Sequence, residues 1–587
     1  MKFNGLRLLF LSAATPALAA VLATSNSDDS TSHQHVIGGD HVDSDRFTCD
    51  LPPPVAPPAS DGLLSADELF GGAEARELQA HRLAAAVRVP SVSYDDMQDV
   101  DVDPRWAVFA DLHRVFEALF PVVHRHMTVT KINQYGLVFS INGSDSSLRP
   151  ILLTGHQDVV PVPDPSAWTH PPFSGYFDGT WLWGRGAADD KSSVTALLSV
   201  AEALLAHEDW TPRRTLILAF GCDEESLGER GAGAINKHLE AVYGRDSMVL
   251  LLDEGGSGLD LVQGRGDGDE DTLFALPAVA EKGQINVFYE LRARGGHSST
   301  PLPHTAIGIA AEIVAALEAH AYAPKLVEGS PLHNNYVCRA RYSPDADRNV
   351  TRLVANNELA ALADLLASYD PMLKFRLQTS QAVDIIHAGL KINAMPEKVE
   401  IGVNYRVAPH ESLDTVKQRT VELLQPIVAK YNIALTAFGK EVKEVKEVKG
   451  AAADTDTAAS VVGADGAVHA QYDVDYDASL VVTAPMELPV APITPTTGPV
   501  WDLFSGTIQH TFAFDGGRVV PVGDIMNGNT DTRSYLGLTR NVFRWDPLRP
   551  TSFQNMHAID EAMHIDGHME AVRFYYNLVR NFDAADV

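Results

Sequence analysis

Apolar runs of strand-like composition alternate with helical patterns through the first half of the chain. The strand-like runs are GLVFSIN, ILLTGHQD, TLILAFGCDEE and MVLLLDEGG, which begin at residues 136, 151, 215 and 248. Between the second and third of them, VTALLSVAEALLAHEDW carries apolar residues at helical spacing. This alternation predicts an α/β sheet with mostly parallel strands.

From about Gln284 the pattern changes to a shorter series of strand, helix, strand, helix and strand. Such a series is typical of a small α+β sandwich, which we expect to be inserted in the larger sheet domain. Structure of the larger domain returns near Trp501 and ends in a helix. The segments behind this prediction are INVFYELRARGG, TAIGIAAEIVAALEAH, VEIGVNYRVAP, SLDTVKQRTVELLQPIVAKY, IALTAFGK and the terminal DGHMEAVRFYYNLVRNF.

Two segments lack the pattern of a core. Residues 20–60 are polar and then proline-rich, which predicts a flexible leader. Residues 441–498 open with the charge repeat EVKEVKEVK and continue with few large apolar residues, so we expect a mostly solvated insertion loop. The larger domain is therefore predicted over residues 61–283 and 499–587, and the inserted domain over residues 284–440.

Residues 1–19 are predicted to be a secretory signal peptide, because a basic start precedes an apolar run that ends in small residues. An uncleaved anchor is the alternative, although the run is short for a bilayer span. We expect no stable membrane span after cleavage, and a location in the extracellular space or the vacuolar lumen. Sequons at Asn142 and Asn349 suit a glycoprotein, although such triplets also arise by chance.

The formal net charge of −31 argues against nucleic acid or an anionic membrane as a partner. High solubility is the more ordinary meaning of such a charge. The three cysteines, Cys49, Cys222 and Cys338, form neither a disulfide framework nor a CxxC zinc site. One pair could bridge after secretion, but we do not predict it. Cys222 follows a strand and is expected to be a small buried residue.

Four turns rich in acid or histidine lie in the first part of the larger domain, three of them at the ends of predicted strands. In open α/β sheets, ligands bind beyond the carboxyl ends of the strands, so we expect these turns to converge. Packed carboxylates repel one another and resist burial, and a cation would compensate them. The turns are His156-Gln157-Asp158, Asp189-Asp190, Asp223-Glu224-Glu225 and Asp253-Glu254.

Histidine and carboxylate side chains suit zinc, and a carboxylate can bridge two ions. Asp158 could accept the second ring N–H of His156 and so fix its tautomer. One of two adjacent glutamates can bind metal while the other acts as a base toward a metal-activated water. Each turn also has an ordinary explanation: a surface His–Asp pair, a solvated DEE turn, or helix capping by the aspartates of GAADDK. Their common place at strand ends in one domain favours the metal site.

The chain also contains GHQDVVPV, HPPFSGYFDGTWLWGRGAADDKSSV, DEESLGERGAG, LLDEGG, GGHSSTP, INAMPEKVEIGVNYRV, GNTDTRSYLGLTRNVFRWDP and NMHAIDEAM. Together these motifs resemble the carboxypeptidase S branch of the dinuclear zinc peptidases, a family that includes aminoacylase and carboxypeptidase G. The resemblance covers residues 75–440 and 500–580. It implies a zinc-peptidase catalytic domain with an inserted lid or dimerisation domain, and two Zn²⁺ ions per subunit.

The resemblance also implies a set of metal ligands. The two histidines would each bind one zinc ion, an aspartate would bridge the ions, and a glutamate would complete one of them. In LLDEGG both Asp253 and Glu254 are candidates for the last ligand, because relatives differ at this turn and strand alternation puts the two side chains on opposite faces. Asp253 is preferred. The remaining ligands are His156, Asp189, Glu225 and His557.

Other roles follow from the same resemblance. Glu224 would be the general base. His297, in GGHSSTP, would reach the oxyanion of the tetrahedral intermediate, often across a dimer interface. Asn393 and Arg406 lie where the family places substrate-contacting groups. Arg533 could bind a substrate carboxylate through its bidentate fork, with a structural ion pair as the equal alternative.

We therefore expect a zinc-dependent carboxypeptidase that hydrolyses the C-terminal amide bond of short peptides. The first alternative is hydrolysis or synthesis of N-acyl amino acids at the same site. The second is a binding protein that keeps the fold without catalysis, which the complete set of ligand and base positions argues against. A homodimer through the inserted domain is left open. Two departures from the family are the long 441–498 insertion and the DEAM that follows His557, where relatives often have an asparagine before the glutamate.

Overall fold

The computed structural model describes residues 46–265, 270–442 and 474–587. The predicted signal peptide, the first part of the leader and most of the EVKEVKEVK repeat lie outside these ranges. Among the described residues, no helix combines the length and the apolar character needed to cross a membrane.

The larger domain is built on an eight-stranded mixed sheet. Its four central strands β6, β3, β7 and β21 run parallel, as the alternating pattern predicts. In spatial order the strands are β1 (Thr128–Ile132), β2 (Gly136–Ile141), β6 (Leu216–Gly221), β3 (Ile151–His156), β7 (Leu250–Asp253), β21 (Val542–Arg544), β10 (Ala278–Glu281) and β20 (Asp524–Met526).

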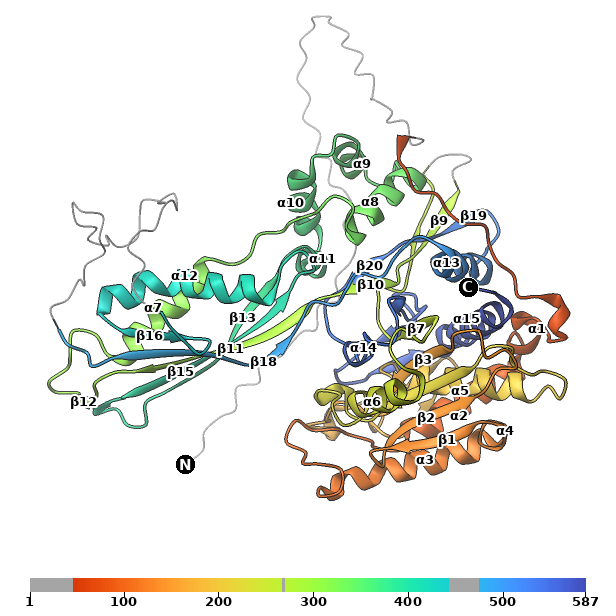
Figure 1. Cartoon of the computed structure of the whole chain (residues 1–587), viewed down its shortest axis with the longest axis horizontal. Helices are drawn as coiled ribbons and strands as arrows, with labels where there is room; N and C mark the ends of the chain where they lie inside the picture. The colour runs from red at the N-terminus through yellow and green to blue at the C-terminus, as the bar shows by residue number, and fades with distance from the viewer. Residues whose placement is uncertain (1–45, 266–269, 443–473) are drawn as a thin grey trace, which may run out of the picture. The chain divides into compact units, whose positions relative to one another are not determined.

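Helices cover both faces of this sheet (Figure 1). Leu153 and Leu252 pack on one face with α2, α5 and α15, whereas Leu152 and Leu251 pack on the other with α6 and α14. Because successive strand residues point to opposite faces, fully buried strands such as β3 need a helical layer on each side. The helices are α1 (Ala66–Phe70), α2 (Ala73–Val87), α3 (Val108–Leu119), α4 (Pro121–His126), α5 (Lys191–Leu205), α6 (Ala232–Tyr243), α13 (Pro499–Thr511), α14 (Thr532–Tyr535) and α15 (Ile565–Ala584).

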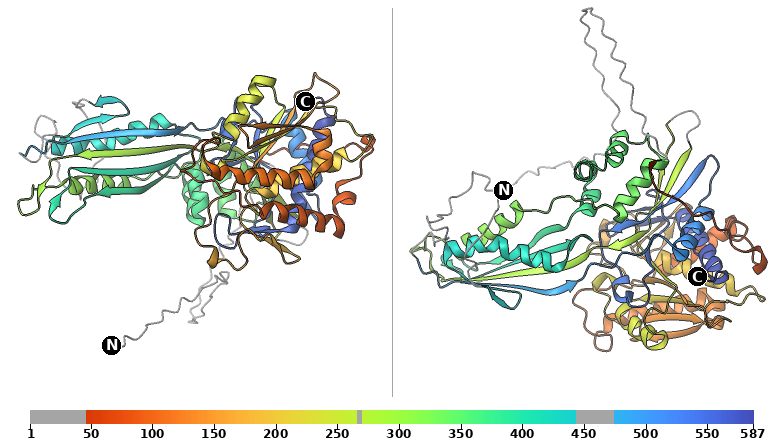
Figure 2. Two further views of the ribbon diagram at one scale, coloured as in Figure 1. Left: turned by 90° about the horizontal axis from the view of Figure 1, so that it is seen from below. Right: turned by 45° about the horizontal axis from the view of Figure 1, so that its top comes forward.

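The inserted domain has a six-stranded sheet with helices α7 (Ala306–Ala319) and α12 (Leu413–Tyr431) on one face (Figure 2). The five elements expected from the sequence are present, as β11, α7, β15, α12 and β16. In spatial order the strands are β13 (Ser380–Ala388), β15 (Lys398–Val407), β11 (Gly283–Arg292), β18 (Ser479–Leu488), β16 (Ala434–Ala437) and β17 (Lys440–Val442).

Three smaller sheets complete the described fold. One joins β12 (Gly296–His297) to β14 (Ala394–Met395). The second contains β19 (Gly517–Pro521), β9 (Asp271–Ala275) and β8 (Leu259–Val262). The third contains β22 (Phe553–Gln554), β23 (Ala562–His564), β5 (Trp181–Trp183) and β4 (Tyr176–Phe177).

The structure corrects the expectation of a loop throughout residues 441–498. Residues 479–488 form β18, which pairs with β11 on one side and β16 on the other. Its alternating pattern buries Leu480 and Val482 in the core of the inserted domain. Four helices that the sequence analysis did not predict lie between β12 and β13 in the chain and pack with β10 and β20 of the eight-stranded sheet: α8 (Pro331–Tyr342), α9 (Arg348–Ala355), α10 (Leu359–Tyr369) and α11 (Pro371–Leu377).

The last part of the predicted leader is packed against the protein. Cys49 forms a disulfide with Cys338 of α8, with the two Cα atoms 5.2 Å apart. Val55 donates its backbone N–H to Gly506 of α13, whose missing side chain makes room for the Val55 side chain. The prediction of a flexible leader is therefore wrong for residues 46–60. Cys222 is free and buried, as predicted.

Candidate metal centre

His156 occupies the last position of β3 and is buried. Since β3 lies between β6 and β7, the ends of three parallel strands meet around it. Ring Nδ1 donates a hydrogen bond to the main-chain oxygen of Asp158 at 3.0 Å. Nε2 is therefore the ring atom presented to the acidic turns, and its orientation is fixed from behind.

Asp189 lies in the turn before α5, and its two carboxylate oxygens face different histidines. Oδ1 is 2.9 Å from Nε2 of His156. Oδ2 is 2.9 Å from Nε2 of His557, which lies in the turn before β23. One carboxylate thus joins two imidazoles, which is the arrangement that a carboxylate bridging two cations requires.

Each histidine has one further acidic neighbour. Oε1 of Glu254 is 3.4 Å from Nε2 of His156, and Oε1 of Glu225 is 3.1 Å from Nε2 of His557. Glu224 forms no such pair, but potential ligand atoms of Glu224, His156 and Glu254 all lie within 4.8 Å of one another. The site therefore offers two sets of ligands that share Asp189, and one additional carboxylate.

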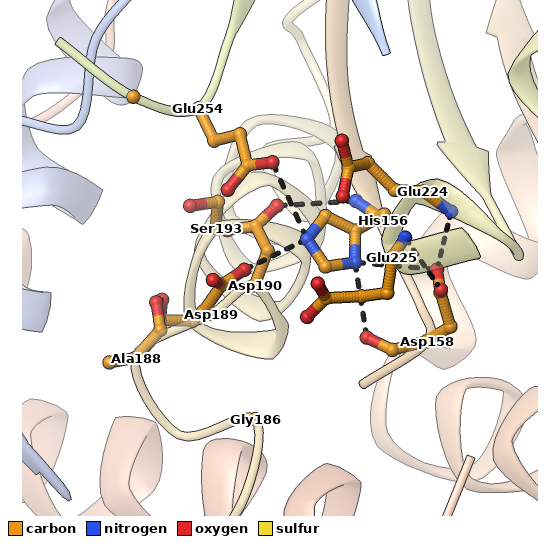
Figure 3. Close-up of polar contacts among 12 residues, drawn as sticks. His156, Asp158, Gly186, Ala188, Asp189, Asp190, Ser193, Glu224, Glu225 and Glu254 are labelled. Atoms are coloured by element: carbon orange, nitrogen blue, oxygen red, sulfur yellow. Dashed lines mark hydrogen bonds and ion pairs between the residues drawn. The ribbon is translucent and has the colours of Figure 1, made fainter. Parts of the chain in front are cut away.

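Glu254 turns toward His156 (Figure 3). Asp253 is the last residue of β7 and is buried, while Glu254 is the first residue beyond the strand. Because neighbouring side chains on a strand leave on opposite sides, only one of the two acids can face the histidine. The geometry therefore favours Glu254 over the preferred Asp253 as the acid beside His156, and the ligand at this turn stays a prediction.

Asp158 contacts both His156 and the turn that carries Glu224 and Glu225. Its carboxylate accepts the backbone N–H groups of Glu224 and Glu225, each at 3.1 Å, and the hydroxyl of Ser93 at 2.7 Å. The residue thus orients His156 through its main-chain oxygen and through Oδ1, which is 3.4 Å from Nδ1, and it holds the glutamate turn through its carboxylate. Sequence reasoning missed Ser93, because one serine in VPSVSY has no distinguishing pattern.

The third carboxylate of the DEE turn has a structural role. Asp223 accepts the backbone N–H groups of Arg230 and Gly231, at 2.8 and 2.7 Å. It closes the loop that follows β6, and burial raises its pKa to about 6. The unusual run of three acids therefore divides into a loop anchor, Asp223, a carboxylate paired with His557, Glu225, and a carboxylate without a direct histidine pair, Glu224.

The pKa shifts of the side chains in this site indicate an environment that favours bound positive charge. Burial raises the pKa of Glu224 to about 8 and raises the pKa of Glu225 and Glu254 as well. Burial opposes a positive charge on His156, yet Glu254 and Asp158 outweigh it and hold its pKa well above the usual value. Hydrogen bonds to Asp189 and Glu225 raise the pKa of His557 to about 10. Nitrogen and oxygen atoms that stabilise positive charge between them match the donor set of Zn²⁺.

Two arginines lie at the edge of the centre. Nη2 of Arg533, on α14, is 3.5 Å from the main-chain oxygen of Glu224. Arg406, on β15, donates to Oδ1 of Asn529 at 2.6 Å. Within the described ranges, neither guanidinium lies within 4 Å of a carboxylate, so the ion pair considered for Arg533 is not found there. Asn529 was missed, although GNTDTRSY, which contains it, was noted.

His297 and Asn393 lie at a different end of the inserted sheet. Gln284 pairs with Arg406 near the start of β11, whereas β12, which carries His297, follows the far end of that strand. A strand of this length spans about 30 Å. Ser298, next to His297, donates its N–H to the main-chain oxygen of Asn393. The structure therefore groups Asn393 with His297 and separates both from Arg406.

The sequence matches the description "Peptidase family M20/M25/M40" over residues 152–581. The chain belongs to this family. It is 31% identical to carboxypeptidase S of Saccharomyces cerevisiae, over 88% of this chain and 86% of that protein. It is also 28% identical to the N-fatty-acyl-amino acid synthase/hydrolase PM20D1 of Homo sapiens, over 87% of this chain and 89% of that protein.

Among solved structures, human carnosine dipeptidase 1 aligns with a TM-score of 0.57 at 14% identity, over 90% of this chain and 100% of that chain. This likeness confirms the predicted α/β fold with an inserted domain. Membership of the M20 family makes the protein a hydrolase of the metallopeptidase class, with carboxypeptidases among its relatives.

Proposed function

We propose that this M20 enzyme is a zinc-dependent carboxypeptidase that cleaves the C-terminal amide bond of short peptides. The observation that carries the proposal is the pair of histidines on the two oxygens of Asp189, beside Glu224, whose carboxylate lies within 4.8 Å of ligand atoms of His156 and Glu254. Carboxypeptidase S is a relative that matches most of the chain.

The residues present would hold two ions. Asp189 would be shared between them, and the other ligands would divide into His156 with Glu254 and His557 with Glu225. When bound, the ions supply Lewis acidity that polarises the scissile carbonyl and acidifies the attacking water.

Glu224 is the group placed to move the proton. It accepts a proton from the attacking water and returns it to the leaving amine. A base works best when its pKa lies near the working pH, and the buried environment of Glu224 raises its pKa in that direction. Asp158 accepts the backbone N–H of Glu224, which fixes the main chain from which this carboxylate extends.

Arg406 and Arg533 are the groups proposed to bind the terminal carboxylate of the substrate. An arginine fork matches a carboxylate in shape and charge. We expect Arg406→Met to lower kcat/KM for a peptide with a free C-terminus by about 10- to 100-fold, the loss of a charged hydrogen bond. For the same peptide with a C-terminal amide in place of the carboxylate, Arg406→Met is expected to leave kcat/KM unchanged from that of the wild type. Steady-state kinetics on both peptides measure this, with Arg352→Met of the exposed helix α9 as control. Equal losses on both peptides would contradict the assignment.

N-acyl amino acids are the alternative substrates. They share the amide beside a free carboxylate, and a relative named for this chemistry matches most of the chain. Hydrolysis of N-acyl amino acids without turnover of blocked dipeptides would transfer the proposal to that reaction.

His297 is proposed to complete the active site of a second subunit in a homodimer. The edge strand β13 and the turn after it expose Ile385, Ile386, Leu390 and Ile392, with the last two almost fully exposed. Apolar residues on an unpaired strand edge suit pairing with a second copy of the chain. The same end of the domain carries His297 and Asn393.

We also propose that the enzyme works in the secretory pathway, either outside the cell or in the vacuolar lumen. The predicted signal peptide supports this location. The Cys49–Cys338 disulfide supports it independently, because disulfides persist in oxidising compartments.

The test of the proposed function is metal content and substrate range measured on one preparation. We expect about two zinc ions per chain, hydrolysis of a blocked dipeptide, and recovery of activity when zinc is returned after chelation. A protein that binds no metal and hydrolyses neither peptide nor N-acyl amino acid would refute the proposal.

A further inference from the structure

A single buried carboxylate connects the turn that carries Asp189 to the turn that carries His557. Oε1 of Glu561 accepts the backbone N–H groups of Gly186, Ala188 and Asp189, at 3.0, 3.0 and 3.3 Å. Its Oε2 pairs with Arg185. The ligand turn thus directs three backbone donors and one guanidinium at one side chain.

The contact between Glu561 and Arg185 is buried, so its effect on stability depends on whether the carboxylate is fully hydrogen-bonded. The Glu561 side chain has no exposed surface and that of Arg185 is 4% exposed. A buried ion pair with unsatisfied oxygens would destabilise the fold, whereas here four donors from the 185–189 turn satisfy the carboxylate. Main-chain hydrogen bonds also connect the two turns. The N–H of Gly184 donates to the main-chain oxygen of Glu561 at 2.9 Å, and β23 pairs with β5.

The His557 turn needs such an anchor more than the His156 strand does. The side chain of His557 is 50% exposed, while that of His156 is 1% exposed and ends a central strand. His557 also has φ of 60°, in the left-handed region that non-glycine residues seldom adopt. Surrounding contacts must therefore hold the turn in place, and Glu561 supplies four of them.

We propose that Glu561 is a positioning residue that fixes Asp189 relative to His557, and so sets the affinity of the metal ion that His557 would hold. The inference rests on the proposed two-ion site. The ion at His156 depends less on Glu561, because His156 and Glu254 are placed by the ends of β3 and β7. The two ions should therefore respond unequally to its loss.

Glu561→Gln tests this. Glutamine keeps the size and one acceptor oxygen, but its amide would meet the Arg185 guanidinium donor to donor. Competitive zinc titration against a chelator should show two ions on the wild type. In the variant we expect one ion of nearly unchanged affinity and a second bound about 10- to 100-fold more weakly, the usual effect of losing an outer-shell partner. A high concentration of zinc should restore full occupancy of the second site.

Glu202→Gln is the matched control, since Glu202 is another buried carboxylate that accepts two backbone N–H groups, those of Val122 and Val123. It should leave both affinities unchanged. Arg185→Met is the second variant, for the case that Glu561→Gln does not fold. It keeps the backbone contacts of Glu561 and should weaken the same ion by a smaller factor.

The outcomes separate the two proposals. A wild type that binds no zinc refutes the proposed function itself. A wild type with two ions, together with variants whose second ion binds as tightly as before or whose two ions weaken equally, overturns the role of Glu561. Thermal unfolding of each variant, followed by circular dichroism, shows whether the loss is confined to the metal centre.

Discussion

Replacing Glu224 with glutamine is expected to lower kcat by about 10²- to 10⁴-fold, the range that a positioned general base contributes. Glutamine keeps the shape of the side chain but cannot accept a proton from the attacking water. The variant should still bind two zinc ions, because Glu224 is the carboxylate that faces neither histidine as a direct pair. Single-turnover kinetics and metal analysis on the same preparation measure both quantities.

The neighbouring Glu225→Gln is the natural control. Glu225 lies 3.1 Å from His557 and is proposed as a ligand, so its variant should lose affinity for one ion and recover activity with added zinc. Glu224→Gln should not recover. If the Glu224 variant keeps activity within a few-fold of wild type, another group must act as the base and the proposed mechanism fails.

The cluster of histidine and acidic side chains could be predicted because its members carry two signals at once. His156, Glu225 and Glu254 each stand at or just beyond the end of a fully buried strand. Sheet topology brings such ends together, and clustered acids need positive charge. His557 has no such signal, since its turn belongs to a small peripheral sheet, and only the family resemblance pointed to it.

The choice between Asp253 and Glu254 could not be made from the sequence. Strand β7 ends at Asp253, and the two acids face opposite sides because of one residue of register. Neighbouring Asp and Glu have the same chemistry, so only the exact end of the strand distinguishes them. Strand ends are among the least certain features of a sequence-based prediction.

Strand β18 and helices α8–α11 show a different limit. β18 is stabilised by pairing with β11, whose residues lie almost two hundred positions earlier, and a local pattern does not reveal that partner. The helices had local signals that were overlooked, since Ser330 caps α8 ahead of a proline and Asp347 caps α9. The Cys49–Cys338 pair, 289 residues apart, had no spacing motif at all.

His297→Ala is expected to lower kcat by about 10²- to 10³-fold, the effect of removing one oxyanion donor, with little change in metal content. The side chain is exposed, and its ring contacts Ser299 of its own turn. Since the strand that leads to it is about 30 Å long, we expect the residue to serve a partner subunit.

Mixing the two inactive variants tests this placement. A chain with His297→Ala keeps its metal centre and Glu224, and a chain with Glu224→Gln keeps its His297. If His297 acts across the interface, each mixed dimer contains one complete site, and random pairing should restore about a quarter of wild-type activity. No recovery, in a mixture that sedimentation shows to form dimers, would place His297 in its own subunit's site or remove it from the mechanism. Recovery that disappears when Leu390 and Ile392 are both changed to Asp would further identify the exposed turn after β13 as part of the surface through which the subunits share this histidine.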